Sequence, residues 1–312
     1  MAARRSGRWR AVAALVCVAA LVLAACSGDG DEGGDGGDAS TATTGAGAPD
    51  DGRLYIVVAS AEGITSPGLD ALVQALYPLP ETVIAVVAPD TSLPFPPEPP
   101  ADGSPPPSTF ASTAGGYPGI VVQGDTTTAV EAALAGTLPG LPADAGTPEL
   151  VVTGINAGQL IGSLADFSAD VPPAQAAAAG GVPALVVAQG VDTNPPEYAT
   201  GALQAQAWVT DHHDTLAAGD DPASVSILSV PSCVNGDPRG VLEVPIAADD
   251  AGRSLNAVDC ASAATDPADD IDAFNAGYAT LTQLAGTDLA ASTTTVPAAP
   301  ATTAPATTAP PG

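Results

Sequence analysis

The sequence predicts an α/β fold, a Rossmann-like three-layer sandwich around a mainly parallel sheet, and three observations support this expectation. Apolar runs of β-branched residues alternate with Ala- and Leu-rich helical patterns between residues 53 and 290, as in folds whose parallel strands are joined by helices. The early apolar runs lack alternating polar residues, which is typical of strands covered on both faces. Hydrophobic residues make up 46% of the 312 residues and aromatic residues only 4%, so we expect a core of small aliphatic side chains.

The region opens with a strand over residues 54–60, a tight turn, and a helix over residues 66–79. Ser66 can cap this helix through its hydroxyl, and Pro67 suits its opening turn. From Leu69 onward, apolar residues recur at spacings of three and four and form one buried face. Open α/β sheets place their chemistry outside the carboxyl ends of their strands, so the turn between these two elements is the first candidate site.

Strands and helices continue to alternate along the rest of the region. We expect further strands over residues 82–89, 119–124, 149–154, 183–189, 225–230, 241–246 and 278–284. Ala- and Leu-rich patterns predict helices over residues 126–138, 172–181 and 198–219. Residues 90–116 are rich in proline and predict a long loop after the second strand, at the edge of the sheet that holds the candidate site.

The two ends of the chain are expected to lie outside the folded domain, which we place at residues 53–290. Residues 1–26 have the basic start and short apolar run of a signal peptide. The run ends in Leu-Ala-Ala-Cys, which resembles a bacterial lipobox with Cys26 as the lipid-bearing residue; an ordinary signal peptide with an incidental cysteine is the alternative. Gly- and Asp-rich residues 27–52 predict a disordered tether, and Thr-, Ala- and Pro-rich residues 291–312 a disordered tail. We therefore expect an exported protein, anchored by lipid to the outer face of a bacterial cell membrane.

Cysteine content agrees with export. Of the four cysteines, Cys17 lies in the apolar run and Cys26 is the proposed anchor, which leaves Cys233 and Cys260 in the folded domain. Two cysteines in an oxidising compartment most simply form one disulfide, and neither has the spacing of a metal site.

The charge of the chain is strongly negative. The 35 acidic residues all follow residue 26, where only three arginines remain and lysine is absent, so the mature chain carries 3 − 35 = −32. Such a surface repels nucleic acid polymers and anionic lipid headgroups. A phosphate substrate would find few cationic side chains, and a metal ion would have to hold it.

Both histidines lie in the run Thr-Asp-His-His-Asp-Thr of the last predicted helix. On a helix, His212 and His213 point about 100° apart and do not share an ion, whereas Asp211 and Asp214 have the spacing for a weak cation site. We expect this run to be an exposed helix face.

Six segments, taken in order, each resemble a segment of one known enzyme family. "VVASAEGITSPGLDALVQAL" is similar to the frame around an Asn-Asp-Asp-Gly-Ile turn, and "VIAVVAPD" to the second strand of that family. "VVQGDTTTAVEAAL" and "PELVVTGINAG" resemble a helix start and a Gly-Ile-Asn-x-Gly segment. "DFSADVPPAQAAAAGGVPALVVAQ" and "DDIDAFNAGYATLTQL" resemble the later segments, so that the matches extend over roughly 230 residues. Together these segments resemble the SurE family, the survival-protein phosphatases also called 5'/3'-nucleotidases.

The resemblance implies a Rossmann-like sheet with a hairpin-bearing extension, a homo-oligomer in many members, and metal-dependent hydrolysis of phosphomonoesters, typically nucleoside monophosphates. In the family, a divalent ion sits on the two turn aspartates, a serine after the second strand, and the asparagine of Gly-Ile-Asn. Magnesium and manganese prefer such oxygen ligands. A bound ion of this kind contacts phosphate oxygen and lowers the pKa of a bound water.

Carried over residue by residue, the resemblance gives an incomplete metal site. Glu62 stands at the second aspartate and Asn156 at the asparagine, but Ala61 stands at the first aspartate and offers no ligand. Pro94 stands where the serine is expected. The nearby serines are Ser92, the preferred substitute, Ser104 and Ser108, and further donors could come from Asp90, Asp125, Asp166 and Asp170. The glycines of the pattern are kept at Gly63, Gly154 and Gly158, and no catalytic residue is assigned.

Two hypotheses follow for the function. The first is an exported phosphatase or nucleotidase of the SurE type, using Mg²⁺ or Mn²⁺ if active, whose activity is weakened or lost. The alternative is a catalytically inactive SurE-fold binding module at the cell surface, which needs no cofactor. Ala61 and the absence of lysine favour the second, whereas the kept glycines and Asn156 favour some function at the same edge.

Overall fold

The computed structural model describes residues 52–93, 95–143, 146–191 and 197–284. The predicted signal peptide with Cys26, the tether up to residue 51 and the tail at 291–312 lie outside the described residues. Within the described part of the chain, no helix is both long and apolar enough to cross a membrane.

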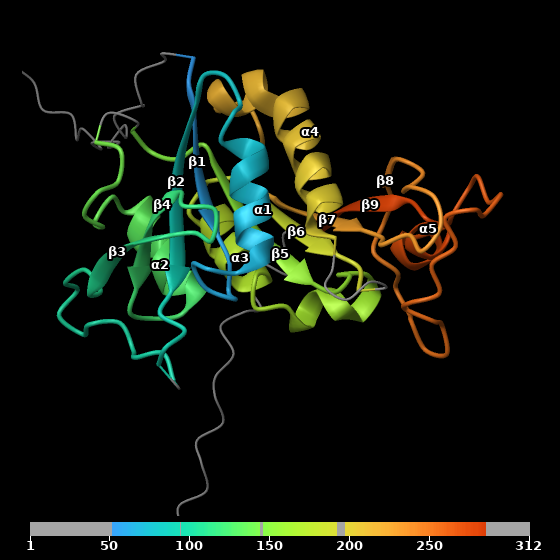
Figure 1. Cartoon of the computed structure of the whole chain (residues 1–312), viewed down its shortest axis with the longest axis horizontal. Coiled ribbons are helices and arrows are strands. Elements are labelled where there is room, and N and C mark those ends of the chain that lie inside the picture. Colours follow the sequence, from blue (N-terminus) through green and yellow to red (C-terminus); the bar gives the residue numbers. More distant parts are fainter. Residues whose placement is uncertain (1–51, 94, 144–145, 192–196, 285–312) are drawn as a thin grey trace, which may run out of the picture. The chain divides into compact units, whose positions relative to one another are not determined.

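The centre of the fold is a nine-stranded sheet in the order β3-β4-β2-β1-β5-β6-β7-β9-β8 (Figure 1). The strands are β1 (Leu54–Ala59), β2 (Thr82–Pro89), β3 (Ser108–Ser112), β4 (Pro118–Val122), β5 (Leu150–Ala157), β6 (Ala184–Gln189), β7 (Val225–Val230), β8 (Val241–Glu243) and β9 (Ala279–Leu284). The six central strands from β4 to β7 run parallel, while β3 and β9 are antiparallel to their neighbours β4 and β7. The mainly parallel sheet predicted from the sequence is confirmed.

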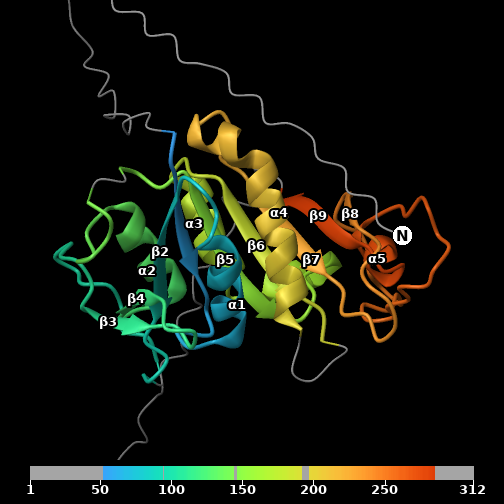
Figure 2. The ribbon, with the colours of Figure 1, turned by 45° about the horizontal axis from the view of Figure 1, so that its top comes forward.

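Helices cover both faces of the sheet and complete three layers. They are α1 (Pro67–Leu76), α2 (Thr126–Leu134), α3 (Val171–Ala179), α4 (Tyr198–Ala217) and α5 (Asp270–Asn275), with a 3-10 helix, η1, at Gly162–Phe167. Figures 1 and 2 show α1 and α4 side by side on one face. The other face is covered by α2 and α3, which contact each other. The fold class expected from the sequence is therefore correct.

Alternate residues of β1 supply the two hydrophobic cores. Leu54, Ile56 and Val58 pack with the apolar faces of α1 and α4, whereas Tyr55, Val57 and Ala59 pack with α2 and α3. Every residue of β1 is buried, as expected for a central parallel strand between two helical layers. Ser66 caps α1 as predicted, since its hydroxyl accepts the N–H of Leu69 at 3.2 Å.

Three short elements were not predicted. β3 lies inside residues 90–116, which we expected to be a loop; its five residues pair antiparallel with β4. η1 follows β5, and α5 precedes β9. The tip of the β3–β4 hairpin is held on α1, because Asp70 accepts hydrogen bonds from the Thr113 hydroxyl at 2.6 Å and the Gly115 N–H at 2.5 Å.

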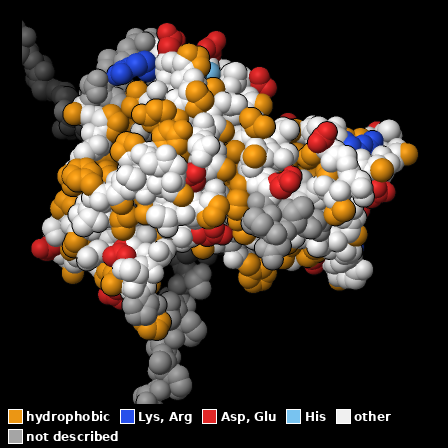
Figure 3. Space-filling model, viewed as in Figure 1, with side chains coloured by type: hydrophobic (Ala, Val, Ile, Leu, Met, Phe, Trp, Pro, Cys, Tyr) orange, Lys and Arg blue, Asp and Glu red, His pale blue; other side chains and the backbone are white. Residues whose placement is uncertain are grey.

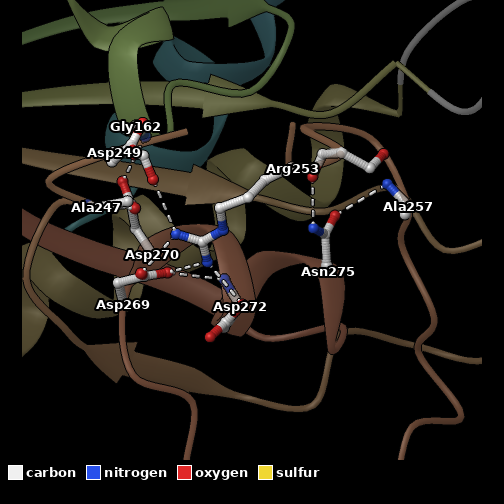
Figure 4. A network of polar contacts seen from close by, with 10 residues as sticks. Gly162, Ala247, Asp249, Arg253, Ala257, Asp269, Asp270, Asp272 and Asn275 are labelled. Carbon is white, nitrogen blue, oxygen red and sulfur yellow. Dashed lines mark hydrogen bonds and ion pairs between the residues drawn. The ribbon is translucent and has the colours of Figure 1, made fainter. Parts of the chain in front are cut away.

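Residues 231–278, between β7 and β9, form an excursion held by a small apolar cluster that includes Phe274 of α5 and by a network of polar contacts. Arg253 binds the carboxylates of Asp269 and Asp272 at 2.6–2.7 Å. The buried carboxylate of Asp270 accepts the N–H groups of Gly162 and Ala247 at 2.8 and 2.9 Å, and thereby ties the excursion to η1 (Figure 4). Burial raises the pKa of Asp270, although the backbone N–H groups oppose this effect.

A disulfide joins Cys233 to Cys260 across 27 residues of this excursion, with the Cα atoms 5.9 Å apart, which confirms the predicted pairing. We expect the double variant Cys233→Ala/Cys260→Ala to lose about 3 kcal/mol of unfolding free energy, because the bond restricts the unfolded chain. Denaturation by guanidinium at neutral pH measures the loss, with reduced wild-type protein as the comparison. An unchanged midpoint in both samples would show that the other contacts of the excursion hold it without the disulfide.

Candidate functional site

The carboxyl ends of β2, β1 and β5 lie side by side, because these three strands are parallel neighbours in the sheet. The turn after β1, the segment after β2 and the end of β5 therefore meet at one edge. This is the edge at which open α/β sheets bind ligands, and the three preferred metal-site candidates from the sequence, Glu62, Ser92 and Asn156, lie in these three segments.

The turn after β1 is built on buried hydroxyls. Ser60 is fully buried; its backbone carbonyl accepts the N–H of Gly63 at 3.3 Å and its hydroxyl oxygen accepts the N–H of Glu62 at 3.3 Å. The cap residue Ser66 approaches the same hydroxyl at 3.5 Å. The Glu62 side chain is exposed at the tip of the turn. These hydrogen bonds connect the turn to the start of α1.

The segment after β2 packs directly against this turn. Gly63 has a φ of +92°, and a Cβ added there would lie 2.8 Å from the side chain of Thr91, so only glycine fits. The next residue, Ser92, donates its hydroxyl to Asp90 at 2.6 Å, and its N–H bonds the same oxygen at 3.0 Å. Ser92 is the predicted serine substitute nearest the turn.

Asn156 lies at the end of β5 and is engaged by groups of the protein. Its amide N–H donates to the carbonyl of Gly158 at 2.8 Å, and its oxygen accepts the hydroxyl of Ser168 at 3.2 Å. Ser168 in turn accepts the N–H of Asp170 at 3.2 Å. The oxygen that the resemblance assigns to a metal ion therefore already accepts a hydrogen bond.

Asp170 fills the space beside the turn. Its side chain is only 1% exposed, and its carboxylate accepts the backbone N–H of Ala61 at 2.8 Å. Thr153 of β5 donates its hydroxyl to the Asp170 carbonyl at 2.7 Å, which fixes the residue from the other side. Burial raises the pKa of Asp170 to about 6, opposed by the Ala61 N–H and assisted by the negative charge of Glu62.

The pKa of Tyr198, the first residue of α4, is raised mainly by burial of its phenol. The negative charge of Glu62 raises it further. The structure thus brings Glu62 near Asp170 and Tyr198, and Ser168 connects Asp170 to Asn156.

The residues present do not fit the divalent ion that the family uses. In the described part of the chain, no three His, Cys, Asp or Glu side chains are arranged to hold a metal ion. Of the four further donors suggested by the sequence, only Asp170 reaches the turn. Asp125 caps α2 through Thr128 at 2.8 Å, Asp90 binds Ser92, and Asp166 is exposed on η1. We therefore assign no step of a reaction to a metal ion here.

The three described arginines are also placed away from this turn or held by other groups. Arg53 precedes β1 and lies at the opposite edge of the sheet. In the excursion, Arg239 donates to the carbonyls of Ala264 and Ala276 and lies over the ring of Tyr278, and Arg253 is paired with aspartates. Figure 3 shows acidic side chains spread over one face of the molecule and basic ones only at its margins.

A doubly wound α/β sheet with its polar groups at the β1 and β5 ends defines a class of Rossmann-like proteins, and the comparisons give the family within it. A family model described as "Survival protein SurE" matches residues 56–248, more than half of the chain. The chain belongs to the SurE family, a family of phosphatases and nucleotidases. The structure resembles the crystal structure of the SurE protein from Aquifex aeolicus with a TM-score of 0.52 over 74% of this chain and 92% of that one; at 18% identity this likeness shows the fold.

Two buried hydrogen-bonding groups near the site were not predicted from the sequence. The bond between Asp170 and Ala61 was not predicted, although Asp170 was named as a donor. Gln189, at the end of β6, is fully buried and joins three elements: its oxygen accepts the Gly201 N–H of α4 at 2.8 Å, and its amide donates to Val230 and Ser232. A glutamine at the end of an otherwise apolar run was the available signal.

Proposed function

We propose that this protein is an exported SurE-family member in which metal-dependent hydrolysis of phosphomonoesters is weakened or lost. The observation that carries the proposal is the hydrogen bond from Ala61 to Asp170. At the position where the family has its first metal-binding aspartate, a methyl group is present, and the nearest buried carboxylate is bound to the backbone of the turn.

The negative charge around the turn also supports a weakened or lost phosphatase activity. Phosphate is held in proteins by metal ions, cationic side chains or backbone N–H groups. At this edge the Ala61 N–H is taken by Asp170, and the exposed acid Glu62 stands beside it. A phosphate dianion approaching the turn would meet negative charge rather than a partner, so substrate binding and catalysis both weaken.

The test restores the lost carboxylate. We expect the full-length protein to show no chelator-sensitive turnover of p-nitrophenyl phosphate with Mn²⁺ or Mg²⁺. The variant Ala61→Asp/Asp170→Thr places a carboxylate at the family position and removes the competing acid. It should bind Mn²⁺ at least about tenfold more tightly by calorimetry, because carboxylates supply the charge that hard cations need.

The matched control is Ala61→Asn/Asp170→Thr, which has nearly the same shape without the new charge and should bind Mn²⁺ no better than wild type. Chelator-sensitive turnover by the wild-type protein at or above the rate of the Ala61→Asp/Asp170→Thr variant would overturn the proposal. Equal Mn²⁺ affinity in the Asp and Asn variants would show that Ala61 is not what limits the site.

We propose further that the protein is anchored to the outer face of the cell membrane by lipid on Cys26, which lies outside the described residues. The support is the basic, apolar and Leu-Ala-Ala-Cys pattern of residues 1–26. Cells expressing the wild type should incorporate radioactive palmitate into this protein, and cells expressing Cys26→Ser should not. Equal labelling of the two proteins would exclude the anchor.

A binding module is the second candidate, and exposed apolar side chains at the same edge favour it. Phe95 follows β2 and Phe167 ends η1 after β5, and their side chains are 83% and 82% exposed. Exposed aromatic side chains of this kind are enriched in binding surfaces. The excess of acids argues against a nucleic acid polymer as partner, and a homo-oligomer remains a proposal from the family resemblance.

A further inference from the structure

A pocket lies at the edge of the sheet opposite to the candidate site, near the amino ends of β6 and β7. It has a volume of about 160 Å³. Its walls come from α4, from the segment that follows α4, and from the strands β6 to β9. The pocket exists because α4 covers β6 and β7 but not the outer strands β9 and β8, which continue beside it (Figures 1 and 2).

One wall is a pair of aromatic rings. Trp208 and His212 are one helical turn apart on α4, and their rings stack with centroids 4.2 Å apart and planes inclined by 19°. The Nδ1 of His212 lies 2.8 Å from the carbonyl oxygen of Trp208. Because a carbonyl only accepts, Nδ1 carries the hydrogen, and the Nε2 of a neutral imidazole is left as an acceptor. The predicted exposed face is correct for Asp211 and Asp214 but wrong for His212 and His213, which are both half-buried.

Two carboxylates face the same pocket. Glu243 ends β8 and is paired in register with Leu281, which places it on the α4 side of the sheet. Asp221 follows α4 and accepts the hydroxyl of Thr215 at 3.0 Å. Gln283 donates to the Ser226 hydroxyl at 2.8 Å on the floor of the pocket. Among the described residues that line the pocket, none is Lys or Arg.

We propose that this pocket binds a small organic cation, a guanidinium or primary ammonium group, with its charge on Glu243 and Asp221 and its apolar part against Trp208. Carboxylates hold such groups through charge-assisted hydrogen bonds, and an indole face attracts cations. A volume of about 160 Å³ is below the 300–1,000 Å³ typical of drug-sized ligands, so the site suits a side-chain-sized group. The negative charge of the chain draws cations toward it.

The pocket is independent of the function proposed above, because it lies at the other edge of the sheet. The same cationic group could belong to a free small molecule or to a basic side chain of a peptide. Agmatine represents the first source, and the blocked peptide acetyl-Gly-Arg-Gly-amide the second. The corresponding citrulline peptide and N-butylurea are neutral controls of similar shape.

Trp208 is the reporter, since Trp9 is the sole other tryptophan in the sequence. In the full chain carrying Trp9→Phe, we expect a saturable change in tryptophan fluorescence with one or both cationic probes, confirmed by calorimetry. The neutral controls should cause no such change. Saturation by agmatine identifies a free cation as sufficient; saturation by the arginine peptide alone identifies a side chain. Both results support the proposal.

Charge variants locate the binding. Glu243→Gln and Asp221→Asn should each weaken the affinity by about tenfold, the usual effect of losing one charge-assisted hydrogen bond. Asp211→Asn is the matched control: it removes one charge from the exposed side of the same helix and should leave the affinity within about twofold. No saturable signal up to about 10 mM of either probe, equal binding of the neutral controls, or equal weakening by Asp211→Asn would each overturn the proposal.

Discussion

Asp170→Asn is expected to stabilise the protein by about 3 kcal/mol at about pH 8 and to change its stability little at about pH 4. The pKa of Asp170 rises from 3.8 to about 6 in the folded protein, mainly through burial. The folded state therefore disfavours the ionised form. The stability contributed by the neutral carboxyl is fully present below pH 3.8 and is lost as the pH rises through about 6. Asparagine is neutral throughout this range, and its oxygen can keep the bond to the Ala61 N–H.

Urea denaturation of wild type and Asp170→Asn at the two pH values measures this difference. Asp166→Asn is the control, because Asp166 is exposed on η1, four residues away. Glu62→Gln offers a second check: without the neighbouring charge, the pKa of Asp170 falls and the gain from Asp170→Asn becomes smaller. A loss of stability at both pH values would show that the hydrogen-bonded carboxylate is worth more than its burial costs.

Most of the fold could be predicted because its signals are local. The apolar runs that form β1, β5, β6 and β7 are buried on both faces over most of their length, and their sequence shows this without knowledge of their neighbours. β3 could not be found in the same way. None of its residues is buried, it follows a run of prolines, and its hydrogen bonds depend on β4 being next to it.

The scaffold of the site was predictable for the same reason, and its contacts were not. The resemblance singled out Gly63, Gly154 and Asn156, since each belongs to a short motif, and the structure places them in the turn after β1 and in the second half of β5. The bond from Ala61 to Asp170 joins residues 109 positions apart, and no periodicity or spacing encodes it. Similarly, Asp270 stands in a run of acidic residues that gives no sign of burial, yet it is buried and accepts two backbone N–H groups that only the folded excursion supplies.

Gly154→Ala is expected to lower the unfolding free energy by at least about 3 kcal/mol. The reason is that Gly154 is tightly packed against the neighbouring strand. Gly154 lies in β5 with a φ of +123°, a conformation that side chains rarely adopt. A Cβ at this position would collide with the carbonyl oxygen of Val187 in the neighbouring strand β6. Because backbone cannot turn aside as a side chain can, β5 and β6 would have to separate where their register already shifts, between Gly154 and Asn156.

Gly158→Ala separates the two causes of this cost. Gly158 has nearly the same φ, +124°, but a Cβ there would meet only the Asn156 side chain, at 3.8 Å. It should therefore lose only the strain of its backbone conformation, on the order of 1–2 kcal/mol. Guanidinium denaturation of both variants gives the difference; if Gly154→Ala fails to fold while Gly158→Ala folds, the collision is the cause. Equal losses in the two variants would mean that β6 yields to the added methyl group, and that the path of the strand carrying Asn156 is set by backbone conformation alone.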